Sequence, residues 1–214
     1  MSLLGGVTKK PSSFIIDKLF KKIIEEKREH ERKEDTYWVS DLVMCPQKRV
    51  YSLSFPELTF NLNINTITGT ILHEGLEKMI KDIFGDQALV EEEVEKTVTI
   101  DNRTIRITGR PDVIIIDNNE KIPIEIKTVN GYSELPFEHH AEQLKVYLWL
   151  LGVRRGYLLY KLPEGFAEFV IEANVTDDDI IKYIKDGKKP RYDWECKYCP
   201  FATFCPYRVK TSKK

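Results

Sequence analysis

Long hydrophobic runs are missing from this sequence of 214 residues. No stretch approaches the ~20 apolar residues that span a bilayer, and the longest fully apolar runs, such as residues 113–116 and 147–151, are short. The first residues also lack the basic segment and apolar core of a secretory signal. We therefore expect an intracellular, cytoplasmic protein with no membrane partner.

The sequence also has little net charge, since 33 basic side chains face 34 acidic ones. This balance excludes only a uniformly basic binder of nucleic acid. The charge is unevenly distributed: residues 9–33 carry +4, residues 34–181 carry -12 and residues 182–214 carry +7. Two basic ends enclose an acidic middle, which is either a set of solvated faces or a patterned binding surface.

Cysteine is scarce, with four residues in the chain. Structural disulfides are rare in a reducing compartment, so metal or cluster ligation becomes the better explanation. Cys196 and Cys199 are separated by two residues, Cys205 follows after five more, and Cys45 lies far upstream. The spacing alone leaves zinc and an iron-sulfur cluster equally open.

The periodicity of apolar residues predicts helices before and after a run of strands. We expect helices over residues 14–33, from Ser40 through Cys45 towards Tyr51, and over 67–84, 138–151 and 176–185. Strands are expected over 90–100, 103–108, 113–116, 122–129, 156–161 and 166–171. The order predicts one mixed α/β domain with a central sheet and a small cysteine-rich tail that includes Cys45. We place the boundaries at 1–37, 38–185 and 186–214.

Two acidic residues fall opposite each other if the hairpin turns on Asn118 and Asn119. Asp112 then faces Glu125, and like charges in that position repel unless a cation lies between them. Lys127 points to the same side as Glu125. A divalent ion beside an ammonium group suits phosphodiester hydrolysis. A cross-strand salt-bridge cluster on a solvated face explains the same spacing equally well.

Three further polar residues lie on the helices around these strands. His73 stands beside an apolar stripe, and Gln143 and Tyr147 share one face of the 138–151 helix. Each alone is typical of an ordinary boundary residue. The basic residues of segment 182–214 provide charges that suit the phosphates of DNA, and Tyr192, Trp194 and Tyr198 provide rings that suit its bases. The alternative is that the basic residues form a solvated face and the rings pack on the cysteines.

Taken together, the motifs resemble the RecB-like branch of the PD-(D/E)XK nuclease superfamily. The four motifs occur in the family's order: Gly69-x-x-x-His73, Gly109-Arg110-Pro111-Asp112, Glu125-Ile126-Lys127 and Gln143-x-x-x-Tyr147. One cysteine before them and three after them resemble the CRISPR-associated exonucleases, the fourth Cas protein family. The resemblance covers residues ~40–207.

The resemblance implies a restriction-endonuclease-like α/β fold, in which residues 38–185 form the nuclease domain and residues 186–214 an iron-sulfur subdomain closed by Cys45. It assigns His73, Asp112 and Glu125 to a Mg²⁺ or Mn²⁺ ion and Lys127 to catalysis, with Gln143 and Tyr147 in support. Cys45, Cys196, Cys199 and Cys205 would hold a 4Fe-4S cluster, in preference to 2Fe-2S or zinc.

The implied activity is 5′ to 3′ exonuclease cleavage of single-stranded DNA in CRISPR spacer acquisition, an antiviral defence. Its expected partners are the Cas integrase subunits and further copies of the chain. Other classes stay open: a DNA-binding or assembly module with an inactive nuclease site, a nuclease of DNA repair, or a zinc protein with a structural carboxylate face.

Overall fold

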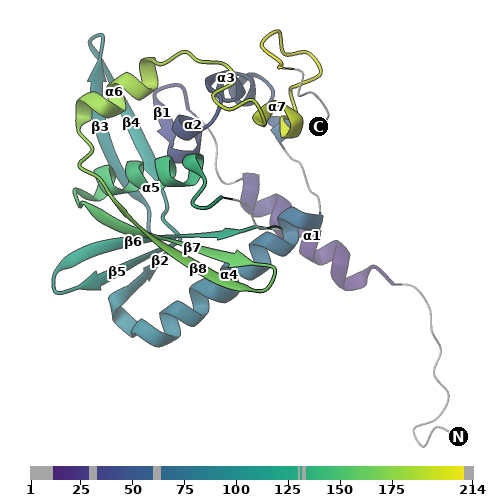
Figure 1. Cartoon of the computed structure of the whole chain (residues 1–214). Helices are drawn as coiled ribbons and strands as arrows, with labels where there is room; N and C mark the ends of the chain where they lie inside the picture. The colour runs from purple at the N-terminus through teal and green to yellow at the C-terminus, as the bar shows by residue number, and fades with distance from the viewer. Residues whose placement is uncertain (1–11, 29–32, 60–63, 130, 132–133, 210–214) are drawn as a thin grey trace, which may run out of the picture. The chain divides into compact units, whose positions relative to one another are not determined.

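The computed structural model describes residues 12–28, 33–59, 64–129, 131 and 134–209 (Figure 1). The chain divides into two compact units, Met1–Glu31 and Arg32–Lys214. The first unit contributes helix α1 (Phe14–Arg28), whose apolar Phe14, Ile15 and Ile16 are exposed. The helix expected over residues 14–33 is present over Phe14–Arg28, and residues 29–32 of the prediction lie outside the described residues.

The second unit mixes helices and strands along its length. Its helices are α2 (Val39–Val43), α3 (Pro46–Ser54), α4 (Ile64–Phe84), α5 (Glu138–Leu151), α6 (Asp177–Lys185) and α7 (Glu195–Tyr198), with short 3-10 turns η1 (Pro56–Thr59) and η2 (Gly85–Gln87). Its strands are β1 (Thr36–Trp38), β2 (Ala88–Val90), β3 (Val94–Ile100), β4 (Arg103–Gly109), β5 (Val113–Asp117), β6 (Glu120–Thr128), β7 (Arg155–Leu162) and β8 (Gly165–Glu172). Within the described residues, no helix has both the length and the apolar character needed to cross a lipid bilayer.

The strands form two mixed sheets rather than the one central sheet expected from the sequence. One sheet has the order β1-β4-β3 and the other β2-β5-β6-β7-β8. The strand expected over residues 90–100 is confirmed over Val94–Ile100, but its first part is wrong, because Glu91 has a φ of +51° and separates β2 from β3. A left-handed residue interrupts the extended chain, so β2 pairs with β5 while β3 pairs with β4.

The hairpin of β5 and β6 has the predicted register. Asn118 and Asn119 have φ values of 48° and 68°, which a two-residue hairpin turn needs at both central positions. The ladder pairs Val113 with Ile124. Asp112, one residue before β5, therefore continues the ladder opposite Glu125, as the sequence predicts.

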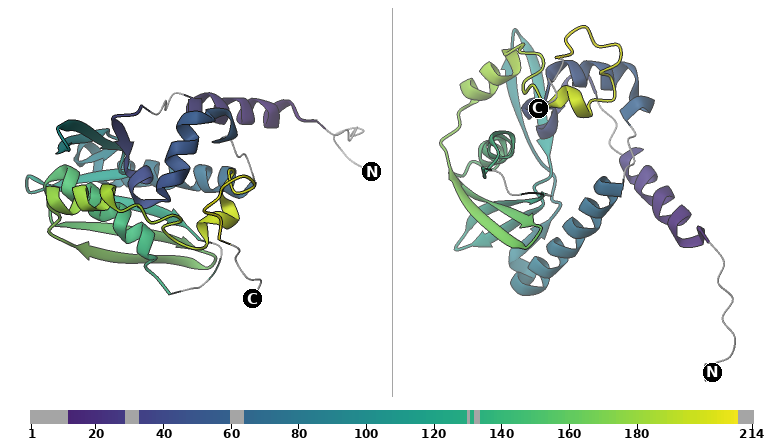
Figure 2. Two further views of the ribbon diagram at one scale, coloured as in Figure 1. Left: turned by 90° about the horizontal axis from the view of Figure 1, so that it is seen from above. Right: turned by 45° about the vertical axis from the view of Figure 1, so that its right-hand side comes forward.

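Helix α5 lies between the two sheets, and α4 covers the other face of the five-stranded sheet (Figures 1 and 2). Successive side chains along a strand point to opposite faces of its sheet. Leu158 and Tyr160 of β7 join the core around α5, whereas Ile126 of β6 joins the core beneath α4. Both faces of the central strands are therefore buried, which explains the nearly continuous apolar character of residues 113–116.

The helix expected from Ser40 through Cys45 is wrong, because two helices meet there. Ser40 lies inside α2, which ends at Val43, and Cys45 occupies the residue before α3. Pro46 is the first residue of α3, a position where its missing N–H costs no hydrogen bond. The break leaves the Cys45 side chain at a helix junction instead of within a helix.

Candidate active site and cysteine pocket

The six predicted site residues on the nuclease motifs come together at the junction of α4, β5, β6 and α5. Glu125 and Lys127 pair in register with Leu158 and Tyr160, whose side chains pack in the core around α5. Because paired positions in a parallel ladder share a face, the two β6 side chains point towards α5. That helix carries Gln143 and Tyr147, so β6 and α5 line one site.

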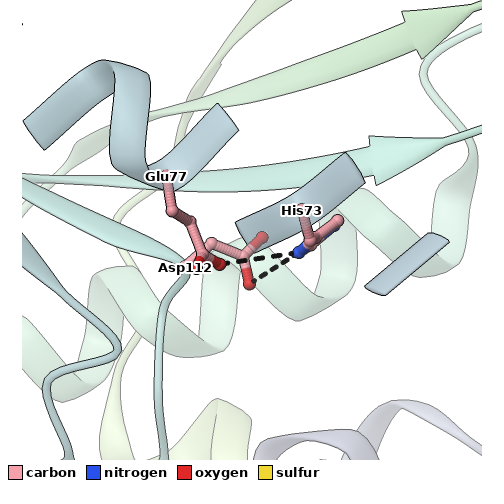
Figure 3. A group of neighbouring side chains, drawn as sticks. All are labelled: His73, Glu77 and Asp112. Atoms are coloured by element: carbon pink, nitrogen blue, oxygen red, sulfur yellow. Dashed lines mark ion pairs between the residues drawn. The ribbon is translucent and has the colours of Figure 1, made fainter. Parts of the chain in front are cut away.

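Asp112 and His73 meet over the backbone of β6. The Asp112 carboxylate accepts a hydrogen bond from the Ile126 backbone N–H at 2.5 Å, and His73 Nε2 contacts the Ile126 carbonyl oxygen. His73 Nδ1 lies 3.6 Å from Asp112 Oδ1 and 3.7 Å from Glu77 Oε1 (Figure 3). One ligand atom from each of these three side chains lies within 4.8 Å of the others.

Glu125 is the most deeply buried carboxylate of the site, with 2% of its surface exposed. Its Oε1 accepts hydrogen bonds from Lys127 Nζ at 2.6 Å and from Gln143 Nε2 at 2.5 Å. Its Oε2 is buried and has no hydrogen-bond partner among the described residues. A buried carboxylate oxygen is normally satisfied, so this atom is an acceptor whose partner is missing from the described residues.

Burial and mutual repulsion keep these carboxyls from ionising easily. Burial, followed by the charge of Glu77, raises the pKa of Asp112 to about 6 despite the nearby Lys127 and His73. Burial and the charge of Asp112 raise the pKa of Glu125 to about 7. Burial opposes the charge on Lys127, but the two carboxylates outweigh it and raise its pKa. The site therefore lacks positive charge relative to its acidic groups, and a cation stabilises it.

Tyr147 supports the segment that carries Asp112. Its hydroxyl donates a hydrogen bond to the Arg110 carbonyl oxygen at 2.9 Å. A Cβ on Gly109 would lie 2.6 Å from Val39 and 2.9 Å from the Tyr147 ring, so only glycine fits beside this ring. One packing contact thus explains both Gly109 and Tyr147, which belong to two separate motifs.

The sequence did not single out two acidic residues of this site, Glu77 and Glu91. Glu77 follows His73 by one helical turn and is buried, a spacing that could have indicated a shared face. Glu91 follows β2, and its pKa is raised by burial and then by the charge of Glu77. Only the pairing of β2 with β5 brings it to the site.

The residues fit a divalent ion of the Mg²⁺ or Mn²⁺ type. Such ions take carboxylate oxygens, and Mn²⁺ also takes imidazole nitrogen. His73, Glu77 and Asp112 supply one nitrogen and two carboxylates within 4.8 Å of one another. Glu125, the third predicted ligand, is not one of these three residues, but its unpaired Oε2 is a further oxygen donor in the same site. A simple salt-bridge cluster would leave that atom unexplained.

The four cysteines line one pocket at the other end of the unit. Cys45, Cys196, Cys199 and Cys205 all border it, and all carry free thiols. Burial raises the pKa of Cys45 and of Cys199, and neighbouring cysteines raise the pKa of Cys199 further. Four thiols that border one pocket have the composition of a ligand set for a metal ion or a cluster.

Two buried residues of the tail hold Cys45 in place. The Glu195 carboxylate accepts hydrogen bonds from the Cys45 N–H at 2.6 Å and from the Tyr192 N–H at 2.8 Å. Arg191 Nε reaches the Met44 carbonyl oxygen at 3.5 Å. In all views, α7 lies beside α3 (Figures 1 and 2). The tail therefore contacts the backbone at the early cysteine.

One known protein is similar to nearly the whole of this chain. The chain is 37% identical over 202 residues to the CRISPR-associated exonuclease Cas4 of Saccharolobus solfataricus, covering 91% of this chain and 99% of the relative. No protein-family profile matches the sequence.

Solved structures resemble the fold. The crystal structure of SSO0001 matches with a TM-score of 0.87 and 37% identity over 92% of this chain and 98% of that one. The alkaline exonuclease LHK-Exo of Laribacter hongkongensis matches with a TM-score of 0.48 and 16% identity, over 72% and 84% of the two chains. From its identity to the Saccharolobus protein over nearly the whole of both chains, this chain belongs to the family of the CRISPR-associated exonuclease Cas4.

Proposed function

We propose that this nuclease is a metal-dependent exodeoxyribonuclease that degrades single-stranded DNA from its 5′ end. The unpaired Oε2 of Glu125 beside the group of His73, Glu77 and Asp112 carries the proposal. The name of the Saccharolobus relative supports exonuclease activity and a CRISPR role. By the same resemblance, the chain trims DNA for spacer acquisition in a cytoplasmic assembly with the Cas integrase subunits and further copies of itself.

His73, Asp112 and Glu125 would hold a Mg²⁺ or Mn²⁺ ion, with Glu77 as an added ligand. When bound, such an ion polarises a phosphoryl oxygen and acidifies a coordinated water. Protonation of any of these ligands competes with the ion. The raised pKa values of Asp112 and Glu125 therefore make the proposed site sensitive to pH near neutrality.

Lys127 and Gln143 position the reacting groups. Lys127 stays protonated because two carboxylates raise its pKa. Its ammonium group is directed by the hydrogen bond to Glu125 Oε1 and stabilises negative charge that develops on the phosphate. Gln143 holds the same oxygen from the other side, which leaves Oε2 as the free donor. Tyr147 fixes the Arg110 carbonyl and thereby the approach of Asp112 to the site.

The cysteine pocket would hold a 4Fe-4S cluster whose role is structural. The tail from residue 186 contains few buried apolar residues, Phe201 among them. So small a segment cannot bury a core of its own, and thiolate ligation supplies the missing folding energy. Anaerobically purified protein should be coloured, absorb near ~400 nm and contain iron. A colourless, zinc-containing protein would contradict the cluster.

Cleavage of end-labelled DNA tests the proposed activity. Protein purified anaerobically is incubated with 5′- or 3′-labelled single strands and with duplex, in Mn²⁺, in Mg²⁺ and in EDTA. We expect metal-dependent loss of single strands, with mononucleotides or short products released first from the 5′ label. Blocking the 5′ end should stop the reaction. Equal cleavage of 5′-blocked strands would contradict degradation from the 5′ end, and cleavage in EDTA would contradict the dependence on a metal ion.

A further inference from the structure

A row of ring side chains runs from the cysteine pocket to the start of α5. Trp194 and Tyr198 line the pocket, with ring centroids 6.5 Å apart. The Trp194 ring lies 4.8 Å from that of His139, which lies 4.1 Å from that of His140. These contacts connect the cysteine-rich tail to the helix that carries Gln143 and Tyr147.

The inner end of the row reaches the catalytic strand. The His140 ring lies 5.6 Å from the Tyr160 ring, and His140 Nδ1 is 2.9 Å from the Tyr160 hydroxyl. Tyr160 pairs in register with Lys127. We call Tyr198, Trp194, His139, His140 and Tyr160 the aromatic row. It spans the distance from the tail to the proposed active site.

The row is exposed at its outer end and buried at its inner end. Tyr198 is 64% exposed and Trp194 36% exposed, whereas Tyr160 is completely buried. Burial, helped by the charge of Lys127, lowers the pKa of both His139 and His140, so both imidazoles are neutral at pH 7. The inner rings are covered by their neighbours, since His139 stacks on Phe137 with ring centroids 5.6 Å apart. The exposed rings of the row are therefore Tyr198 and Trp194, which together with the exposed Tyr207 form an apolar patch beside the cysteine pocket.

Cations stand beside the exposed rings. Lys197 Nζ lies 5.1 Å from the centroid of the Tyr198 ring. Lys189 Nζ lies 4.9 Å from the ring of Tyr207, another exposed residue of the same pocket lining. Rings that stack on bases, interleaved with cations that contact phosphates, are the usual design of a surface for single-stranded nucleic acid. Duplex DNA hides the faces of its bases and does not fit this design.

We propose that Tyr198 and Trp194, at the exposed end of the aromatic row, form a base-stacking site that holds single-stranded DNA beside the cysteine pocket on its way to Lys127. The expectation that the bound strand leads towards Lys127 rests on the proposed nuclease function. The expectation that the rings bind DNA does not. The competing role for the same rings is to shield the contents of the pocket from solvent. That role predicts no dependence of DNA binding on bases.

Binding of labelled oligonucleotides to the purified holoprotein in EDTA separates stacking from cleavage. The arms are a single strand of ~20 nucleotides, the same strand with abasic sites throughout, and its duplex. Stacking contributes about 1–3 kcal/mol per base, so wild-type protein should bind the abasic strand at least about 10-fold more weakly than the normal one. Equal affinity for the two single strands would overturn the proposal without any variant.

Variants locate the site on the row. Tyr198→Ala should weaken binding of the normal strand about 10-fold, and Tyr198→Phe, which keeps a ring, should bind within about 3-fold of wild type. Phe166→Ala is the matched control, because it removes an exposed ring from β8, outside the row. Iron and zinc content is measured for each protein. Unchanged DNA affinity in Tyr198→Ala and Trp194→Ala would overturn the proposal.

The nuclease function is read separately by adding Mn²⁺ to the same proteins. Base-dependent binding without cleavage would refute the proposed nuclease and leave the stacking site intact. Metal-dependent cleavage with base-independent binding would refute the stacking site and leave the nuclease intact.

Discussion

The raised pKa values of the two buried carboxyls make a quantitative prediction about Mn²⁺ binding. Burial and neighbouring acids raise the pKa of Asp112 to about 6 and that of Glu125 to about 7. The ion needs both groups ionised, so affinity is full at pH 8 and falls as the pH drops through 7 and 6. Protonation of His73, whose pKa is raised by Glu77 and Asp112 against the effect of burial, acts in the same direction.

The size of the effect follows from these values. At pH 5.5, ionising Glu125 costs about 2 kcal/mol and ionising Asp112 about 1 kcal/mol, since one pH unit corresponds to about 1.4 kcal/mol. The sum of about 3 kcal/mol predicts a loss of Mn²⁺ affinity of about 100-fold between pH 8 and pH 5.5. Without the ion, the stability of the folded state depends on pH in the opposite direction. The folded state prefers protonated carboxyls, so stability is highest at low pH and falls as the pH rises through 6 and 7.

Titration calorimetry with Mn²⁺ at pH 8 and pH 5.5 measures the first effect, and thermal denaturation in EDTA measures the second. Circular dichroism at both pH values checks that the fold is retained. Glu125→Gln, which has no carboxyl at this position, should lose most of the pH dependence. A change in wild-type affinity of less than about threefold would refute the reasoning, as would stability in EDTA that rises with pH.

Three substitutions test other parts of the structure. Glu77→Gln should weaken Mn²⁺ binding by about 10- to 100-fold. Glu74→Gln, an exposed change on the same helix, should leave the affinity unchanged. Equal calorimetric affinities of the two variants would exclude Glu77 as a ligand. Glu195→Ala leaves two part-buried N–H groups unpaired, which costs about 1–3 kcal/mol, so purified protein should contain less iron or zinc per chain. Full metal content would refute the role of Glu195 in holding Cys45. Gly156→Ala places a Cβ 2.8 Å from the Pro123 carbonyl oxygen. It should lower stability by about 1–3 kcal/mol, measured as a lower Tm. An unchanged Tm would show that the strand shifts to accommodate the Cβ.

Features set by local chemistry could be predicted from the sequence. Asn118 and Asn119 tolerate positive φ, so they predict a two-residue turn. That turn sets the register of the hairpin, which places Asp112 opposite Glu125. The helix Glu138–Leu151 was predicted with its observed bounds because its apolar spacing is regular and Gly152, with a φ of +68°, ends it.

Features set by tertiary contacts could not be predicted. Alternating polarity looks the same within one long strand and across two strands of different sheets, so the break at Glu91 was missed. Glu77 resembles any acidic residue on a helix until Asp112 of a distant strand is placed beside it. The contact of Glu195 with the Cys45 backbone spans 150 residues of sequence and has no local signature.

Single-turnover cleavage of labelled single-stranded DNA by Glu125→Gln tests the central claim most directly. This variant keeps the shape and burial of the side chain but removes the free carboxylate oxygen. Glu120→Gln, an exposed change on the same strand, serves as the control. With saturating Mn²⁺, we expect Glu120→Gln to cleave like wild type and Glu125→Gln to be slower by at least about 100-fold. Cleavage by Glu125→Gln at the wild-type rate would contradict the assignment of this site as the nuclease centre.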